Sequence, residues 1–161
     1  MPKSPRLYQH LTVVAAPWLE RKYSHPALVR LFEGSLDPRI MRYWLEQDHH
    51  YLLEYARSFS RIAAQAPNES LPTLIDGAHY TLNIEILRLK QLGRLFSADF
   101  TNVIVGQTCA SYAGYLNSYS LDYETGVISL VPCMMGFASL GISIRPPEEP
   151  RFRQWIETYS S

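Results

Sequence analysis

One carboxylate lies where the helical pattern of the sequence places apolar side chains. Asp48 shares a predicted helical face with residues that recur at three- and four-residue steps, namely Met41, Trp44, Leu45, Tyr51, Leu52 and Tyr55. A carboxylate on an apolar face is costly unless another group pairs with it. Asp48 is therefore either a structural residue bonded to a tyrosine hydroxyl or an arginine, or an acceptor for the N–H groups of a ligand.

A thiol lies in the least charged helical segment of the chain. In the run LVPCMMGF, Pro132 removes a backbone donor directly before Cys133, and Phe137 follows one turn later on the same face. A small thiol beside a flat ring suits a nucleophile in a pocket for a flat heterocycle. The structural alternative is an inert, buried thiol. The other cysteine, Cys109, supports no functional prediction, and two cysteines without CxxC spacing predict no disulfide framework.

The run EQDHH contains half of a metal-ligand pattern. Glu46 and His49 have the ExxH spacing of di-iron carboxylate proteins. A second such pair is missing, because His79 has no Glu three residues before it and Glu85 has no His three residues after it. Walker, GxGxxG, GxSxG and HExxH motifs are also missing. We therefore expect no metal and no cofactor. A metal-dependent oxidase that uses Glu46, His49 and Glu85 is kept as an alternative.

Helices must position all of these residues. Helical periodicity covers nearly the whole chain, and no segment shows convincing strand alternation. Asp37-Pro38 predicts a helix start, with Asp as the N-cap and Pro in the first turn, and Gly93 is a plausible C-cap. We predict helices over residues 7–22, 38–65, 71–93, 107–119, 123–144 and 150–159. Residues 1–161 should form one all-α domain, a bundle of about six helices in which the nearly uncharged 123–144 helix is central.

Composition restricts the partners of the 161-residue chain. It has 15 Lys+Arg and 15 Asp+Glu, so its formal charge is zero and nothing favours binding to a polyanion. No apolar stretch approaches the roughly 20 residues that span a bilayer, and the amino terminus is a poor signal peptide. We expect a cytoplasmic protein whose partners include neither nucleic acid nor a membrane. The 11 tyrosines suit either a pocket for a flat, hydrogen-bonded ligand or simple helix contacts.

Several blocks of the sequence resemble the TenA/thiaminase II family, which has a haem-oxygenase-like helical fold. These blocks are SHP with LFEGSLDPRIMRYWLEQDHHYLLEYAR, then SYAGYL, LVPCMMGFASLG and FRQWIETYSS. They occur in the family's order, at about its spacing, over residues 24–161. The resemblance implies hydrolytic removal of an amino group from an aminopyrimidine, or cleavage of thiamine, in thiamine salvage. An alternative is a relative that binds a pyrimidine or thiamine without catalysis.

The resemblance also implies roles for individual residues. Asp48 would bind the exocyclic amine and a ring nitrogen of the pyrimidine, and Cys133 would be the nucleophile that adds to the ring. The side chains expected to line or hold the ring are Tyr51, Phe137 and Tyr159. Tyr112 corresponds to the family's tyrosine beside the nucleophile. Tyr115 stays open as an alternative, because the interval to Cys133 is slightly short.

The sequence departs from the family pattern at two points. Met135 replaces the aromatic residue of the PC-x-W motif, and the chain ends at Ser161. Family members continue through about two more helices, which carry a glutamate that acts as general acid and base. We expect a shortened paralogue, a fragment, or a chain completed by a partner, in which Glu85 or Glu157 could replace that glutamate. An apolar 125–144 helix without its cover predicts a homo-oligomer, a dimer or a tetramer.

Overall fold

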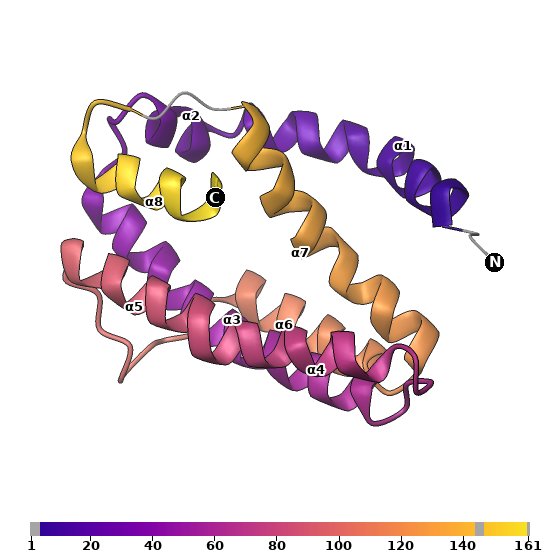
Figure 1. Cartoon of the computed structure of the whole chain (residues 1–161). Helices are drawn as coiled ribbons and strands as arrows, with labels where there is room; N and C mark the ends of the chain where they lie inside the picture. Colours follow the sequence, from indigo (N-terminus) through magenta and orange to yellow (C-terminus); the bar gives the residue numbers. More distant parts are fainter. Residues whose placement is uncertain (1–3, 144–146, 161) are drawn as a thin grey trace. The chain divides into compact units, whose positions relative to one another are not determined.

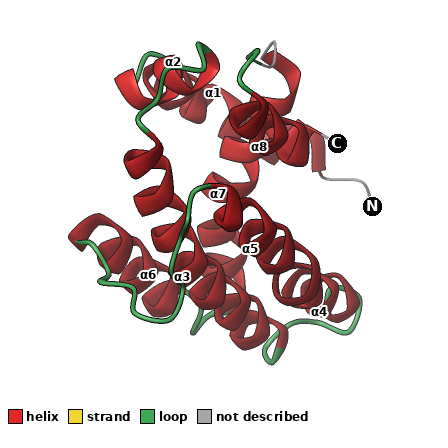
Figure 2. Cartoon of the chain, turned by 90° about the vertical axis from the view of Figure 1, so that its left-hand side faces the viewer, coloured by secondary structure: helices red, strands yellow, loops and turns green. Residues whose placement is uncertain are grey.

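The computed structural model describes residues 4–143 and 147–160, which are helical apart from their connecting loops (Figure 2). The elements are α1 (Ser4–Tyr23), α2 (Pro26–Phe32), α3 (Pro38–Ala63), α4 (Leu71–Tyr80), the π-helical η1 (Thr81–Glu85), α5 (Ile86–Leu95), α6 (Gln107–Tyr119), α7 (Tyr123–Ser143) and α8 (Pro150–Ser160). No strand occurs in these ranges, which confirms the all-α prediction. Position 144, the predicted end of the fifth helix, lies outside them.

The chain divides into two compact units, which are described separately. The central unit is residues 37–131, and the terminal unit is residues 1–36 with 132–161. The central unit contains α3 to α6 and the first part of α7, and the terminal unit contains α1, α2, the rest of α7 and α8 (Figure 1). The first boundary lies directly before Asp37-Pro38, and the second lies between Val131 and Pro132.

Helix α3 is the organising element of the central unit. Its start is the predicted one, because the Asp37 carboxylate accepts the backbone N–H of Arg39 at 2.8 Å and Pro38 occupies the first turn. The consecutive segments α4, η1 and α5 pack along α3, and α6 packs on it as well (Figure 1). The Tyr55 hydroxyl donates to the Leu130 carbonyl at 3.1 Å, which ties the first part of α7 to α3.

The helix predicted over 71–93 contains a π turn that the periodicity did not indicate. The backbone N–H of Ile86 donates to the carbonyl of Thr81, five residues earlier, so this turn holds one residue more than an α-helical turn. The prediction of Gly93 as the C-cap was wrong, because α5 continues to Leu95 and Phe96 is the cap. Gly93 serves packing instead, since the Phe100 ring occupies the space that a Cβ would fill.

In the terminal unit, polar contacts between segments far apart in sequence hold the helices. The Lys22 ammonium, at the end of α1, donates to the Gly136 carbonyl of α7 at 2.6 Å. Gly34 has a φ of +73°, and a Cβ there would lie 3.3 Å from the Cβ atoms of Pro147 and Glu149. Both the left-handed backbone and the close approach therefore favour glycine at this turn. The Glu149 carboxylate accepts the N–H of Phe152 at 3.0 Å and so starts α8.

Helix α7 has both exposed and buried side chains among its described residues. The exposed fraction is 47% for Ile128 and 58% for Met134. Ser129 and Leu130, in contrast, are buried. None of the described helices combines the length and the apolar composition that crossing a bilayer requires.

Two helical glycines of the central unit provide a matched test of packing. We expect Gly93→Ala to lower the free energy of unfolding by about 1–3 kcal/mol, because the new methyl group would overlap the Phe100 ring. Gly114→Ala should instead raise it by about 0.5–1 kcal/mol, because no described atom lies within 4 Å of the new Cβ and alanine favours the helix. Urea unfolding followed by circular dichroism measures both. Changes of the same sign would contradict the assigned packing at Gly93.

Candidate functional site

Asp48 lies on α3 with 9% of its surface exposed. Within the described residues of the central unit, no hydrogen bond is donated to its carboxylate. The structural interpretation, in which a tyrosine hydroxyl or an arginine satisfies Asp48, stays an alternative to the interpretation of Asp48 as an acceptor for a ligand. Burial, and to a smaller extent the charge of Glu85, raises the pKa of Asp48 to about 7. The group changes its protonation state near neutral pH, where it can either donate to or accept from a ligand.

Two other titratable side chains, on different elements, interact electrostatically with Asp48. Glu85, at the end of η1, is half-buried; burial raises its pKa, while Arg88 and a hydrogen bond with Thr81 act in the opposite direction. Cys109, on α6, has its pKa raised by burial and by the charge of Asp48, and its thiol contacts the Gln47 carbonyl at 3.4 Å. No role for Cys109 is predicted from the sequence, although it lies three residues before Tyr112 and therefore on the same face of α6.

Tyrosine rings line the region next to Asp48. The Tyr51 ring, buried on α3, lies 5.2 Å from the Tyr112 ring of α6 at an interplanar angle of 7°, and 5.5 Å from the Tyr55 ring at 27°. The structure thus brings Tyr112 of α6 against Tyr51, which follows Asp48 by about one turn of α3. Tyr115 is 39% exposed and stacks on Tyr112 rather than on Tyr51. This geometry favours Tyr112 over Tyr115 as the tyrosine of the site.

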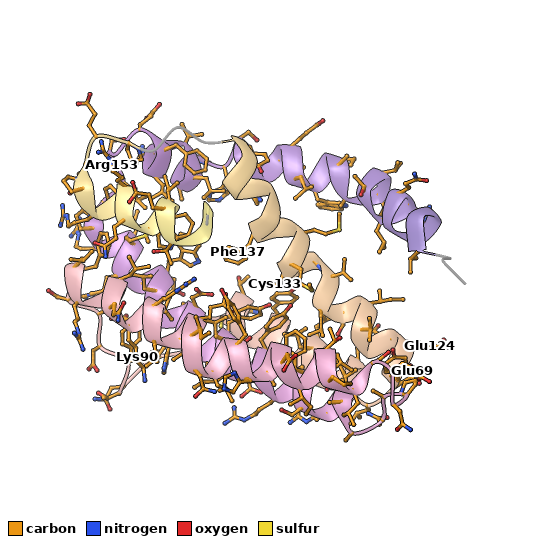
Figure 3. The ribbon with its side chains drawn as sticks, viewed as in Figure 1. Glu69, Lys90, Glu124, Cys133, Phe137 and Arg153 are labelled. Carbon is orange, nitrogen blue, oxygen red and sulfur yellow. The ribbon has the colours of Figure 1, made fainter. Side chains whose placement is uncertain are left out.

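The remaining predicted site residues belong to the terminal unit. Cys133 and Phe137 lie one turn apart on α7, and both are half-buried (Figure 3). Tyr159 lies in α8, and its side chain is outside the described residues. The structure therefore groups Asp48 with Tyr51 and Tyr112, and separately Cys133 with Phe137. That the two groups form one site stays a prediction from the sequence.

The residues of the metal alternative lie in two environments. The Glu46 carboxylate accepts the backbone N–H of Asp99 at 3.0 Å, and the His49 ring lies 5.0 Å from the Phe100 ring, so both contact the loop after α5. Glu85 acts instead on Asp48. Across residues 4–143 and 147–160, no three His, Cys, Asp or Glu side chains gather in a way that could hold a metal ion. A metal-dependent oxidase finds no support in this part of the chain.

The comparison with protein families settles the resemblance noted in the sequence. Residues 14–161 match the model of the TENA/THI-4/PQQC family. The chain belongs to this family. Among solved structures, the TenA homologue protein from P. horikoshii OT3 matches with a TM-score of 0.86 at 19% identity, over 96% of this chain and 76% of that one. The predicted TenA fold is thereby confirmed.

Curated relatives of this TenA-family chain carry names from thiamine metabolism. The chain is 24% identical to the aminopyrimidine aminohydrolase of Halalkalibacterium halodurans, over 91% of this chain and 70% of that protein. It is 26% identical to the hydroxymethylpyrimidine/phosphomethylpyrimidine kinase THI20 of Saccharomyces cerevisiae, over 90% of this chain. The match spans 28% of the yeast protein's length. The activities in these names are candidates that the arrangement of the site residues must be able to support.

The raised pKa of Asp48 predicts a stability change that depends on pH. The folded state keeps the Asp48 proton up to about pH 7, whereas the unfolded chain loses it near pH 4. Between these values the folded state binds more protons, so the Asp48 contribution to stability falls as the pH rises. Asn cannot ionise. Asp48→Asn should therefore be more stable than the parent by an amount that grows from pH 5 to 7, reaching on the order of 4 kcal/mol.

Urea unfolding at pH 5, 6, 7 and 8 measures this difference. Asp37→Asn is the matched control, because its hydrogen bonds with Arg39 hold the Asp37 pKa at about 2, below the window. The control should show no such growth. Parallel pH profiles for the parent and Asp48→Asn would show that the Asp48 carboxylate is solvated or paired.

Proposed function

We propose that the chain is an aminopyrimidine aminohydrolase of the thiaminase II type, which hydrolyses an aminopyrimidine or thiamine with Cys133 as the nucleophile. The observation that carries this proposal is the buried Asp48 carboxylate, which receives no hydrogen bond from the described residues of the central unit and lies beside stacked tyrosine rings. Family membership supports it, as do the relatives from Halalkalibacterium halodurans and Bacillus subtilis, which are both named aminopyrimidine aminohydrolase.

Asp48 suits the edge of an aminopyrimidine. That edge presents an amino group next to a ring nitrogen, so two hydrogen bonds can form with one carboxyl group. Either the neutral acid donates to the ring nitrogen and accepts from the amine, or the carboxylate accepts both bonds from a protonated ring. The Asp48 pKa of about 7 makes both arrangements accessible near neutral pH. The same proton then withdraws electrons from the ring and favours attack by a nucleophile.

The proposed reaction has two steps. The Cys133 sulfur adds to a carbon of the pyrimidine ring and the thiol proton passes to a ring nitrogen, and the leaving group then departs from the methylene substituent of the ring, as ammonia from an aminomethyl group or as the thiazole from thiamine. Water adds to the methylene carbon, the sulfur leaves the ring and recovers its proton, and a hydroxyl group remains on the methylene carbon. Tyr112 would hydrogen-bond the reacting groups, and Tyr51, Phe137 and Tyr159 would hold the ring. Flat aromatic side chains suit this task, because they stack on heterocycles.

The small-molecule partner, the location and the oligomeric state stay predictions. We propose a pyrimidine or thiamine as the small-molecule partner, a cytoplasmic location and a homo-oligomer, either a dimer or a tetramer. Exposed apolar side chains on α1, among them Val13, Val14 and Trp18, are consistent with contact between copies.

Replacing the two thiols separately tests the nucleophile. We expect Cys133→Ser to abolish release of ammonia from an aminopyrimidine and to leave binding of the pyrimidine largely intact, because the nucleophile and the binding groups are different residues. Cys109→Ser is the matched variant; it should retain turnover, because burial and Asp48 raise the pKa of that thiol. Ammonia release and calorimetric binding measure the two effects. Turnover that survives Cys133→Ser but not Cys109→Ser would move the nucleophile to α6, and binding without turnover in the parent would favour the non-catalytic alternative.

Replacing Asp48 tests the binding group. Asp48→Asn should weaken pyrimidine binding by about 1.5–3 kcal/mol, the scale of a hydrogen bond to a charged group. Isothermal calorimetry at pH 7.5 measures the loss. Glu54→Gln is a suitable control, because Glu54 also lies on α3 but its carboxylate pairs with Arg57 and Asn117. Equal affinities for the parent and Asp48→Asn would assign Asp48 a structural role.

A further inference from the structure

Lys22 holds a half-buried positive charge against the backbone of α7. It lies in the last turn of α1, and its ammonium donates to the carbonyl of Gly136, 114 residues later in the chain, at 2.6 Å. Figure 1 shows the end of α1 beside the last part of α7. Burial lowers the pKa of Lys22, because an ammonium in a poorly solvated place loses hydration. A lysine side chain that extends into water avoids this cost, so the contact with Gly136 needs a reason.

The backbone of α7 is weak around this contact. Pro132 has no N–H, so it cannot form the helical hydrogen bond to the carbonyl of Ile128. Gly136 has no side chain to restrict its backbone, which disfavours the helix at this turn. Cys133 lies between Pro132 and Gly136, and Phe137 follows directly after Gly136. The turn with both predicted site residues of α7 therefore gains order from a bond that comes from outside the helix.

Lys22 is itself fixed at its own end of the contact. Its backbone carbonyl accepts the N–H of His25 at 3.1 Å, in the turn between α1 and α2. Its ammonium also lies 4.6 Å from the centroid of the Tyr23 ring, where the negative face of the ring attracts a cation. The neighbouring cation, Arg21, is exposed and lies over the Trp18 ring at 5.3 Å. Lys22 is thus the member of this pair that reaches the backbone of α7, and Arg21 offers a matched control.

We propose that Lys22 is a positioning residue for Cys133, because its hydrogen bond to Gly136 fixes the turn of α7 that carries the thiol. This inference rests on the proposed function, in which Cys133 is the nucleophile. In this role Lys22 acts through the backbone of α7 and takes no part in making or breaking bonds. A sulfur attacks a ring carbon only when the two atoms are close and aligned, so a displaced turn lowers the rate of reaction more than the affinity for the pyrimidine.

Hydrogen exchange of the α7 amides tests the effect on the helix. Lys22→Met removes the ammonium and keeps most of the apolar stem. We expect the amides that follow Cys133 in α7 to exchange about tenfold faster, the scale of one lost hydrogen bond from a charged group. Lys22→Arg keeps a charged donor and should retain most of the protection, and Arg21→Met should leave it unchanged. Equal exchange in the parent and in Lys22→Met would overturn the inference, and Lys22→Gln gives the same test should Lys22→Met not fold.

Kinetics and calorimetry test the effect on the reaction. With an aminopyrimidine that carries an aminomethyl group, Lys22→Met should lower kcat for ammonia release by about tenfold or more. The dissociation constant, measured in the Cys133→Ser background, should change by less than about threefold. Lys22→Arg should restore most of kcat, and Arg21→Met should match the parent.

The outcomes separate the inference from the function on which it rests. An unchanged kcat in Lys22→Met, or an equal loss of kcat and affinity, would overturn the positioning role and leave the proposed function standing. A loss of kcat that Arg21→Met reproduces would also overturn it, because any nearby cation would then serve. A parent protein without turnover of any aminopyrimidine or thiamine would overturn both.

Discussion

The central unit is built around the burial of one carboxyl group. Placing Asp48 among apolar residues of α3, with no donor from the surrounding central unit and with Glu85 nearby, disfavours ionisation and costs stability at neutral pH. The rest of α3 must offset this cost. It does so through a capped start at Asp37 and through buried side chains along one face, among them Met41, Leu45, Leu52 and Ile62. Such a trade of stability for a usable site is common in proteins that bind polar ligands.

Gln47, the residue before Asp48, helps to hold Asp48 in position. The Gln47 side chain donates to the Ile104 carbonyl at 3.0 Å and accepts the Gly106 N–H at 2.7 Å. These two bonds attach the loop between α5 and α6 to α3, and they bring the start of α6 close to Asp48. Cys109 and Tyr112 then follow on that helix. A functional acid on a rigid helix, supported by a neighbour with fixed hydrogen bonds, is positioned more accurately than one on a loop.

Local sequence signals predicted the parts of the fold that depend on local interactions. The Asp37 cap and the bounds of α6 were confirmed, and the placement of Asp48 on an apolar face followed from helical periodicity. Features set by distant residues were missed. Gly93 looked like a C-cap because its real constraint, the Phe100 ring, comes from the following loop. The π turn was not predicted, because one extra residue in a turn leaves the apolar periodicity intact before and after it.

The candidate site shows the same difference between features that local sequence predicts and features that depend on distant residues. Motif blocks were sufficient to identify the family, and the match over residues 14–161 confirmed it. The roles of Asp48, Cys133 and the aromatic residues come from that resemblance and stay predictions. The influence of Glu85 on Asp48 could not be read from the sequence, because the two residues are on separate helices, η1 and α3. Only the packed structure shows that their charges interact.

The stacked tyrosines have a spectroscopic consequence. Tyr55, Tyr51, Tyr112, Tyr115 and Tyr119 form a continuous row in which neighbouring ring centroids are 4.6–6.0 Å apart. Phenol chromophores at this spacing couple their electronic transitions, and the resulting near-ultraviolet ellipticity depends on fixed packing between α3 and α6. Trp44 is the single indole within residues 37–131, so the tyrosine bands suffer little overlap from that unit. This row of tyrosines is thus also an intrinsic chromophore. Its near-ultraviolet signal should change when the packing between α3 and α6 loosens, before the helical content of the two helices changes.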